Sequence, residues 1–389
     1  MDMSIPADIK SQILDIMDLP AHTATAPARI VVAMSGGVDS TVTAGLLKAA
    51  GFHVIGVTLS LRSSSESPCA SRDIEDARAA AEWLGISHHV VDMRETFRRR
   101  IIEPFAETYA RGQTPNPCVN CNPAIKFGAL IAHARELGAH ALVTGHYAEI
   151  RRLAPGAERF GLFTPNDMRR DQSYFLHAAS QEQIDFLRFP LARLEKAKVR
   201  ALAGEMGLER IAAKSDSQDI CFVPPQGYID IVRRLRPQAM RPGDLVHIDG
   251  RVLGRHQGIA RYTIGQRRGL GVTIGEPLYV VEIDAANNRV IVGPKEALAR
   301  RRLILRDINW LGEAPLPTAE TEALPMHVRI RSTRPPKPAR IWSPAPGEVR
   351  VRFDEPEYGV SPGQAGVFYE RPGPGARVFG GGTIAEAAP

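Results

Sequence analysis

The sequence contains few cysteines, few aromatic residues and no long apolar run. Four cysteines in 389 residues are too few for the disulfide framework of a small secreted domain. No apolar run approaches the length of a membrane span, and residues 1–25 lack a basic segment followed by an apolar one. We therefore expect a cytoplasmic protein with no membrane partner, in which each cysteine is a candidate for chemistry or metal binding.

Basic residues are in excess only in the C-terminal part of the chain. Residues 1–225 contain 25 Lys and Arg against 26 Asp and Glu, whereas residues 226–389 contain 24 against 17. Such an asymmetry is typical of a protein that performs chemistry in one part and holds a polyanion with the other. A solvated basic surface is the alternative interpretation.

The segment Ala33–Ser40, with the sequence Ala-Met-Ser-Gly-Gly-Val-Asp-Ser, organises the N-terminal part. It follows a β-branched run that reads as a buried strand and precedes an apolar pattern at helical spacing. A strand, a glycine loop and a helix in this order direct backbone N–H groups and a helix dipole at an anion. Gly36 and Gly37 allow the backbone to approach a phosphate closely, and Asp39 supplies a carboxylate for Mg²⁺ between phosphates.

This loop differs from the two commonest phosphate-binding loops. A Walker A loop requires a lysine after its last glycine, where this chain has Val38 and Asp39, and the spacing does not match G-x-G-x-x-G. Ser35–Ser40 resembles the PP-loop of the ATP pyrophosphatases, which implies cleavage of ATP between its α and β phosphates to adenylate a substrate. An ordinary glycine-rich turn in a Rossmann-like domain is the alternative.

Strand and helix patterns alternate through the N-terminal half, which predicts an α/β fold with a Rossmann-like parallel sheet. The expected strands are 30–33, 54–61, 87–92 and 141–144, and the expected helices are 40–50, 72–84, 97–111, 125–137, 181–189 and 194–206. Functional residues in such sheets gather at the carboxyl ends of the strands.

The rest of the chain has a different character. Gly-rich, strand-like segments follow Pro224 and Pro225, and later strands at 326–332, 348–353 and 366–370 alternate with Pro-rich connections at 315–325 and 335–346. This pattern predicts a small central domain and a C-terminal β-barrel-like domain. The expected division is a peripheral segment 1–27, a catalytic domain 28–225, a central domain 226–304 and a C-terminal β domain 305–389.

Cys118 and Cys121 form a C-x-x-C in a proline-rich loop that runs into a helix. A zinc knuckle would need two more ligands, and Cys69 and Cys221 lack the spacing to supply them. A thioredoxin-like redox pair is a second interpretation. The third, which we favour, is one reactive thiol at a helix N-terminus, where the dipole lowers the thiol pKa.

Several motifs resemble those of the bacterial tRNA-specific 2-thiouridylases, a family of PP-loop ATP pyrophosphatases. Besides the PP-loop, they are Thr114–Asn122 with Ile125–Phe127, Val143–Ala148, Arg170–Leu176, Asp216–Phe222, Tyr262–Leu270 and Ser361–Ala365. The resemblance covers nearly everything from Ile30 to the last expected strands.

The resemblance implies a role for each matching residue. Cys121 would be the catalytic nucleophile, and Cys221 would carry a persulfide. ATP would be bound by Ala33, Met34, Ser35, Gly36, Gly37, Val38, Asp39, Ser40, Leu59 and Gly145, with Mg²⁺ reaching Asp39 through the nucleotide and no structural metal. tRNA would be bound by Asn116, Pro117, Cys118, His146, Arg170, Asp171, Gln172, Arg331, Ser332 and Gln364.

Two positions depart from the family pattern. Some relatives have an aspartate, proposed as an acid or base, where this chain has Cys118, and a thiol supplies no carboxylate. Arg331-Ser332 replaces an Arg-Tyr pair, which removes an aromatic ring that would stack on a base.

The function implied is ATP-dependent 2-thiolation of the wobble uridine of tRNA, by adenylation of the C2 oxygen and sulfur transfer from the persulfide. AMP and pyrophosphate would be released, Cys121 and Cys221 would form a disulfide, and a protein persulfide donor would supply the sulfur. An ATP-dependent amide-forming ligase acting on a small molecule is the alternative, but it leaves the two distant cysteines unexplained. A non-catalytic redox or nucleic-acid module leaves Ser35–Ser40 unexplained.

Overall fold

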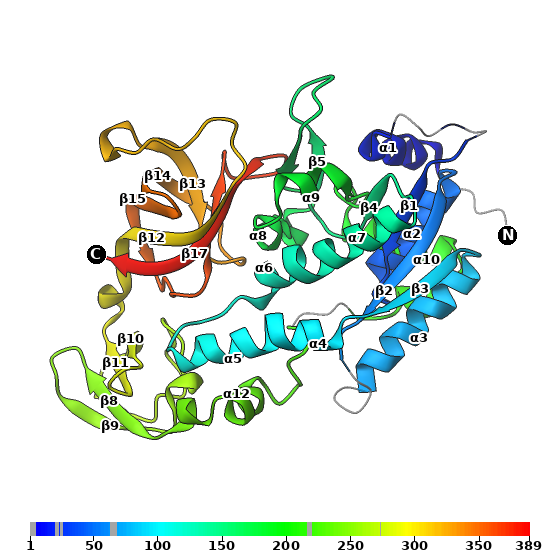
Figure 1. Cartoon of the computed structure of the whole chain (residues 1–389). Helices are drawn as coiled ribbons and strands as arrows, with labels where there is room; N and C mark the ends of the chain where they lie inside the picture. Colours follow the sequence, from blue (N-terminus) through cyan, green and yellow to red (C-terminus); the bar gives the residue numbers. More distant parts are fainter. Residues whose placement is uncertain (1–4, 20–22, 24–25, 63–67, 216–219, 273) are drawn as a thin grey trace. The chain divides into compact units, whose positions relative to one another are not determined.

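A computed structural model of the chain describes residues 5–19, 23, 26–62, 68–215, 220–272 and 274–389. The chain folds as two units, each assembled from separate stretches (Figure 1). The first unit contains Met1–Phe97, Asn120–Phe222 and Gly373–Val378, and the second contains Arg98–Val119, Val223–Pro372 and Phe379–Pro389. Within the described residues, no helix has the length and apolar character needed to cross a membrane.

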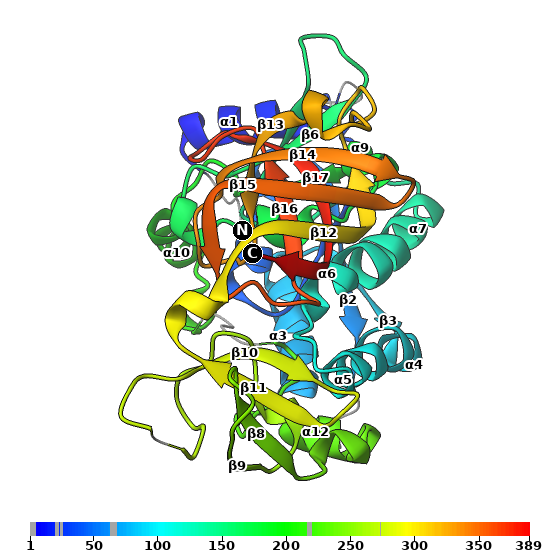
Figure 2. The ribbon, with the colours of Figure 1, turned by 90° about the vertical axis from the view of Figure 1, so that its left-hand side faces the viewer.

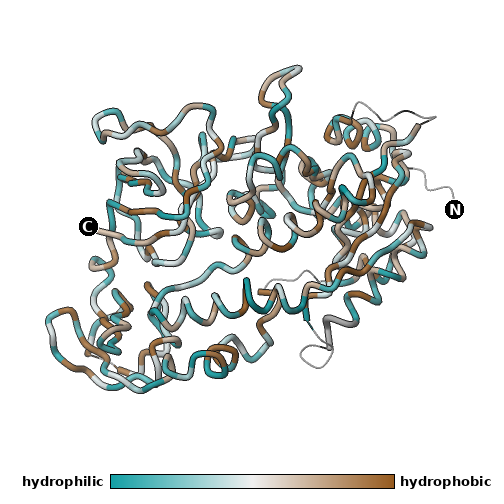
Figure 3. The backbone as a smooth tube through the Cα atoms, viewed as in Figure 1, coloured by the Kyte–Doolittle hydropathy of each residue, from teal (hydrophilic) through white to brown (hydrophobic). Residues whose placement is uncertain are grey.

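The first unit is built on a parallel sheet with the strand order β3-β2-β1-β4-β7. Its strands are β1 (Arg29–Ala33), β2 (His53–Ser60), β3 (Ser87–Asp92), β4 (Ala141–Val143) and β7 (Leu187–Arg188). Every neighbouring pair is parallel. The apolar run of β1 is fully buried at the centre of the sheet (brown in Figure 3). The predicted Rossmann-like sheet is therefore confirmed.

The first unit also contains helices, several of which complete the hydrophobic core of the sheet. They are α1 (Ala7–Met17), α2 (Val38–Ala49), α3 (Pro68–Trp83), α4 (Arg94–Phe97), α7 (Gly128–Glu136), α8 (Ser173–Leu176), α9 (Gln181–Phe186), α10 (Lys196–Glu205) and α11 (Glu209–Ala212), with the π turn η2 (Asn122–Phe127) and the 3-10 turn η3 (Met168–Arg170). Leu46 of α2 and Leu202 of α10 are fully buried in one cluster, which also takes in Ile13 and Met17 of α1. The amphipathic pattern of α1 thus buries its apolar face in the core.

The expected helix at 181–189 is shorter than its pattern suggests. Helix α9 ends at Phe186, and residues 187–188 instead form the edge strand β7. Arg188 explains the break, because its buried guanidinium donates to the carbonyls of Met17, Asp185 and Leu187 and lies 3.9 Å from the centre of the Phe160 ring. A buried charge requires such partners.

A hairpin that the sequence pattern did not predict extends the first unit. Its strands are β5 (Glu149–Arg152) and β6 (Phe160–Phe163), which pair antiparallel. The first residues of β17 (Arg377–Ala388) pair with β6, through Arg377 with Phe163 and Val378 with Leu162. The C-terminal strand thus contributes to a unit formed mostly by the N-terminal half.

The second unit contains a four-stranded sheet with the order β10-β11-β8-β9. Its strands are β8 (Gly243–His247), β9 (Val252–His256), β10 (Tyr279–Asp284) and β11 (Arg289–Gly293), and the same unit contains the helices α5 (Glu103–Ala110) and α12 (Ile229–Leu235). Leu245, Val280, Val290 and Val292 are fully buried and form the core of this sheet.

The second unit also contains a closed β-barrel (Figure 2). Its strands are β12 (Ala299–Trp310), β13 (Leu324–Arg329), β14 (Lys337–Ala345), β15 (Glu348–Tyr358), β16 (Ala365–Tyr369) and β17. They follow the order β12-β15-β14-β13-β16-β17, and pairing of β12 with β17 closes the ring. The predicted C-terminal barrel is confirmed.

One expectation within the barrel is wrong. The segment 335–346, expected as a Pro-rich connection, contains strand β14. Ala339 and Ile341 pair with Phe353 and Val351 and are buried in the barrel core. Pro344 lies where the register with β15 shifts, so its missing N–H removes no ladder bond that the sheet requires.

A buried histidine gives the first unit a specific pH dependence. The Nδ1–H of His177 donates to the Tyr174 carbonyl at 2.7 Å, and burial lowers the pKa of His177 to about 4 from 6.5. The unfolded chain therefore takes up a proton at this residue before the folded chain does, so stability is lost as the pH falls through the unfolded pKa.

We expect His177→Asn, which keeps a donor but does not titrate, to flatten this pH dependence. Between about pH 7 and pH 5 the wild type should lose about 2 kcal/mol of unfolding free energy relative to the variant. Urea unfolding at several pH values measures the difference, and a constant gap across the range would contradict the prediction.

Candidate active site

The glycine loop leads from β1 into α2 with a backbone conformation that favours glycine. Gly36 has a φ of +72°, and a Cβ at this position would lie 2.3 Å from the carbonyl oxygen of Asp73 in α3. Gly37 is the N-cap residue of α2, and no side chain caps this helix end. The first N–H groups of α2 are therefore left for an anion, as the sequence predicts for a phosphate-binding loop.

Two serines hold the loop in shape. The buried Ser40 Oγ accepts a hydrogen bond from the Ser35 backbone N–H at 3.1 Å and donates to the Gly37 carbonyl at 3.2 Å. The two hydroxyl oxygens lie 3.2 Å apart. The hydroxyl of Ser40 thus bonds to both ends of the loop, whereas Ser35 is exposed.

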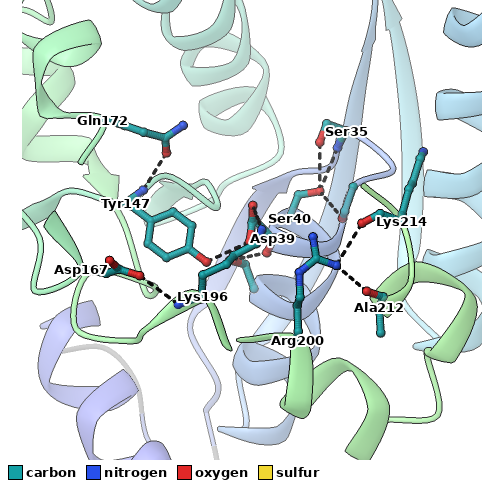
Figure 4. A network of polar contacts seen from close by, with 12 residues as sticks. Ser35, Asp39, Ser40, Tyr147, Asp167, Gln172, Lys196, Arg200, Ala212 and Lys214 are labelled. Carbon is teal, nitrogen blue, oxygen red and sulfur yellow. Dashed lines mark hydrogen bonds and ion pairs between the residues drawn. The ribbon is translucent and has the colours of Figure 1, made fainter. Parts of the chain in front are cut away.

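Asp39, in the first turn of α2, is paired with a cation (Figure 4). Both carboxylate oxygens lie 2.7 Å from Nζ of Lys196, and the Tyr147 hydroxyl donates to one of them at 3.0 Å. In this arrangement the Lys196 ammonium group contacts both carboxylate oxygens. Among the described residues, no group of three or more His, Cys, Asp or Glu side chains is arranged to hold a metal ion.

The other residues expected at the nucleotide lie at the same edge of the sheet. A Cβ on Gly145, just after β4, would come within 2.8 Å of the Asp39 carbonyl carbon and 2.9 Å of the Ser40 nitrogen. Leu59 is half-buried near the carboxyl end of β2, the strand beside β1. The structure therefore brings Ala33–Ser40 and Gly145 together, with Leu59 on the adjacent strand.

A hydrogen-bonded pair connects this edge to the segment Arg170–Gln172. The Tyr147 N–H donates to the side-chain oxygen of Gln172 at 2.8 Å, and the Gln172 N–H donates to the Tyr147 carbonyl at 2.9 Å. Asp171 accepts from the Ser173 N–H at 2.9 Å, while Arg170 is exposed. Tyr147 thus contacts both Asp39 and the segment expected to bind tRNA.

His146 lies in a largely apolar setting beside Gly145. Its ring packs edge-on against Phe127 and Phe189, and its Nδ1 lies 2.6 Å from the Thr144 hydroxyl. Burial lowers the pKa of His146 to about 3, and the charge of Lys126 acts in the same direction. The ring is therefore neutral at physiological pH, which suits contact with a base or a sugar better than with a phosphate.

The cysteines occupy different environments. Cys121 is buried, Cys118 is half-buried and Cys221 is exposed, and none of these three described cysteines is in a disulfide. Cys118 lies in the first turn of the short helix α6 (Pro117–Cys121), whereas Cys121 is its last residue and precedes η2. A helix N-terminus therefore holds Cys118, whereas Cys121 lies three residues further along.

The residues that follow Cys121 and Cys221 in the chain make contacts within the first unit. Asn122, next to Cys121, is buried and donates to the Phe175 carbonyl at 2.9 Å. Phe222, next to Cys221, packs edge-on against Phe97 with ring centres 5.7 Å apart. Residues 216–219 of the Asp216–Phe222 motif, and the side chain of Cys69, lie outside the described residues.

The second unit brings together two of the segments expected to contact tRNA. The Gln364 side chain donates to the carbonyls of Thr114 and Pro115 at 3.1 and 3.2 Å. The Thr114 N–H donates to the Pro362 carbonyl at 2.9 Å. These bonds place Gln364 beside the segment that leads into Asn116, Pro117 and Cys118.

Arg331 and Ser332 take part in bonds that hold the second unit together. The Arg331 guanidinium donates to the Ile264 carbonyl at 3.2 Å, to the Ser361 hydroxyl at 3.3 Å and to the Gly359 carbonyl. The Ser332 carbonyl accepts from Arg329. These contacts give Arg331 a structural role whatever its part in binding.

Three residues at the nucleotide loop were missed by the sequence analysis, namely Lys196, Tyr147 and Lys214. Lys214 Nζ donates to the Gly36 carbonyl at 3.1 Å and to carboxylates of α3 at 2.9 and 3.0 Å. Burial opposes the charge of Lys214, but its bonds to Asp73 and Asp76 raise its pKa overall. Tyr147 lies within a recognised motif, whereas no local pattern distinguishes the two lysines from other helix-end residues.

We expect Gly36→Ala to weaken ATP binding at least about tenfold and to destabilise the chain by about 1–3 kcal/mol, because the loop must move away from Asp73. Gly156→Ala is the matched control, since Gly156 has a φ of +75° with no atom within 4 Å of an added Cβ. That variant should lose about 1 kcal/mol of unfolding free energy through backbone strain alone, and it should bind ATP as tightly as the wild type. Calorimetric titration with ATP compares the two, and equal losses would contradict the prediction.

Comparison with known proteins adds the family context. Three family models match the chain, a tRNA methyl transferase HUP domain over residues 28–225, a tRNA methyl transferase PRC-barrel domain over 230–294 and an aminomethyltransferase beta-barrel domain over 300–384. The chain is 54% identical over 377 residues to the tRNA-specific 2-thiouridylases MnmA of Brucella suis and Brucella canis, which covers 95% of this chain and 93% of each relative.

The similarity to solved structures is weaker. The U34-tRNA thiolase NcsA from Methanococcus maripaludis is 17% identical with a TM-score of 0.37, over 59% of this chain and 73% of that chain. A likeness at this level carries no argument about function.

Proposed function

The chain belongs to the MnmA family of tRNA-specific 2-thiouridylases, and on this premise we propose that it catalyses ATP-dependent 2-thiolation of the wobble uridine of tRNA. The observation that carries the proposal is the loop Met34–Gly37. It presents the uncapped N-terminus of α2 at the carboxyl edge of a parallel sheet, in a chain of this family. Such a loop suits the activation of a carbonyl oxygen by a nucleotide.

The first step overcomes the low reactivity of the uridine C2 carbonyl, which has no good leaving group. The C2 oxygen attacks the α-phosphate of ATP, pyrophosphate departs, and AMP on that oxygen becomes the leaving group. Residues Ala33–Ser40 with Leu59 and Gly145 bind the nucleotide, and their backbone N–H groups offset the charge of the phosphates. Mg²⁺ accompanies ATP as its usual counter-ion.

The second step transfers sulfur. The terminal sulfur of a persulfide on Cys221 attacks C2, the bond from C2 to the adenylated oxygen breaks, and AMP leaves with its electron pair. The Cys121 thiolate then attacks Sγ of Cys221, which releases 2-thiouridine and leaves a disulfide between the two cysteines. A thiol reductant and a protein persulfide donor restore the starting state.

The tRNA substrate is held through its anticodon loop. To reach the nucleotide site, the wobble base must leave its stack, at a cost of a few kcal/mol. In the first unit, His146 and Arg170–Gln172 lie beside the nucleotide loop and contact the nucleic acid. In the second unit, Asn116–Cys118, Arg331, Ser332 and Gln364 do so, and the basic excess of residues 226–389 binds the phosphate backbone. We place this activity in the cytoplasm.

The direct test is mass spectrometry of tRNA nucleosides after incubation with the protein, ATP and a persulfide source. Replacement of oxygen by sulfur on one uridine, with release of AMP and pyrophosphate in equal amounts, is the expected result. Release of ADP would contradict adenylation. ATP turnover without any tRNA would favour the amide-forming ligase.

We expect Cys121→Ser and Cys221→Ser each to reduce thiolation by at least about a hundredfold, because each removes a sulfur that the transfer requires. Both variants should bind ATP normally, since neither residue belongs to the loop. Cys69→Ser is the control and should keep full activity. Full thiolation by either of the first two variants would contradict the two-thiol mechanism.

A further inference from the structure

The nucleotide loop has no basic residue of its own, yet it receives one from a distant helix. Met34–Ser40 contains no lysine or arginine. Lys196, the first residue of α10, reaches the loop and places Nζ 2.7 Å from each oxygen of Asp39 (Figure 4). The fold thus supplies, from far along the chain, the cation that a Walker A loop carries within itself.

The fold fixes the position of this lysine. Its side chain is only 9% exposed. Its backbone N–H donates to the buried carboxylate of Asp167 at 3.2 Å, and Nζ lies 5.8 Å from the centre of the Tyr147 ring. Because its aliphatic chain is buried and its backbone is held, the ammonium group of Lys196 has little freedom. Its charge therefore lies at the N-terminus of α2.

Asp39 is the more accessible partner of the pair. Its side chain is 31% exposed, and it lies in the same first turn of α2 that offers N–H groups to an anion. An arriving triphosphate brings several negative charges to this turn. It therefore competes with the Asp39 carboxylate for the nearby ammonium group, and lysine is a common point-charge ligand of phosphate.

We propose that Lys196 is a phosphate-binding residue of the nucleotide site, and that Asp39 holds its charge in place until the nucleotide binds. On binding, the ammonium group exchanges a carboxylate for phosphate oxygens, and Asp39 moves toward solvent. This inference rests on the ATP-binding part of the proposed function. A purely structural ion pair would instead stabilise the start of α10 without contacting the nucleotide.

The same helix provides a matched control. Lys198 lies two residues along α10, is 42% exposed, and has its ion-pair partner Glu205 at 3.8 Å. Lys196→Met and Lys198→Met remove the same charge from the same helix. We expect Lys196→Met to weaken binding of ATP and of inorganic pyrophosphate by at least about tenfold, and Lys198→Met to leave both unchanged.

Asp39→Asn separates a binding role from a structural one. If Asp39 competes with phosphate, this variant should bind pyrophosphate, measured without Mg²⁺, at least as tightly as the wild type. If the pair is only structural, Asp39→Asn and Lys196→Met should impair pyrophosphate binding alike. Isothermal titration gives the affinities, circular dichroism verifies folding, and Lys196→Gln replaces Lys196→Met if the latter does not fold.

Each outcome has a distinct meaning. Normal binding of both ligands by the folded Lys196 variants, or equal losses in the Asp39 and Lys196 variants, overturns this inference alone. Wild-type protein that binds neither ATP nor pyrophosphate overturns the proposed function as well.

Discussion

In the first unit, the backbone at Gly36 lies so close to the Asp73 carbonyl that no side chain fits at this position. This close approach fixes the loop against α3, and Lys214 strengthens the contact by bonding to the Gly36 carbonyl and to α3 carboxylates. The direction of α2 follows from this placement. So does the position of Asp39, around which Lys196 and Tyr147 gather.

Elements with strong local patterns could be predicted from the sequence. The strand Arg29–Ala33, the glycine loop and α2 follow from a β-branched run, two glycines and helical spacing. The two-residue strand β7 and the proline-containing strand β14 could not be predicted in this way. Strand β7 is too short to show a period, and the prolines of β14 are typical of a connection rather than of a strand.

The residues of the site likewise divide into those that a motif indicates and those that no local pattern indicates. Family motifs indicated the loop, Gly145 and the segment at Gln172, and the structure places these together in the first unit. Neither lysine at the loop belongs to a motif, because a lysine at a helix end has no sequence signature until its partner is known. Motifs also fail to show that Arg331 bonds to two other segments of the second unit, at residue 264 and at residues 359–361.

The way the two units share the chain has a consequence for biosynthesis. Residues 373–378 belong to the first unit, where β17 adds to the hairpin strand β6. A ribosome makes these residues after all the other residues of the first unit, so the unit that contains the nucleotide loop stays incomplete until they are synthesised. A truncation that removes residues 373–378 would therefore damage a fold whose nucleotide loop lies more than 300 residues earlier in the chain.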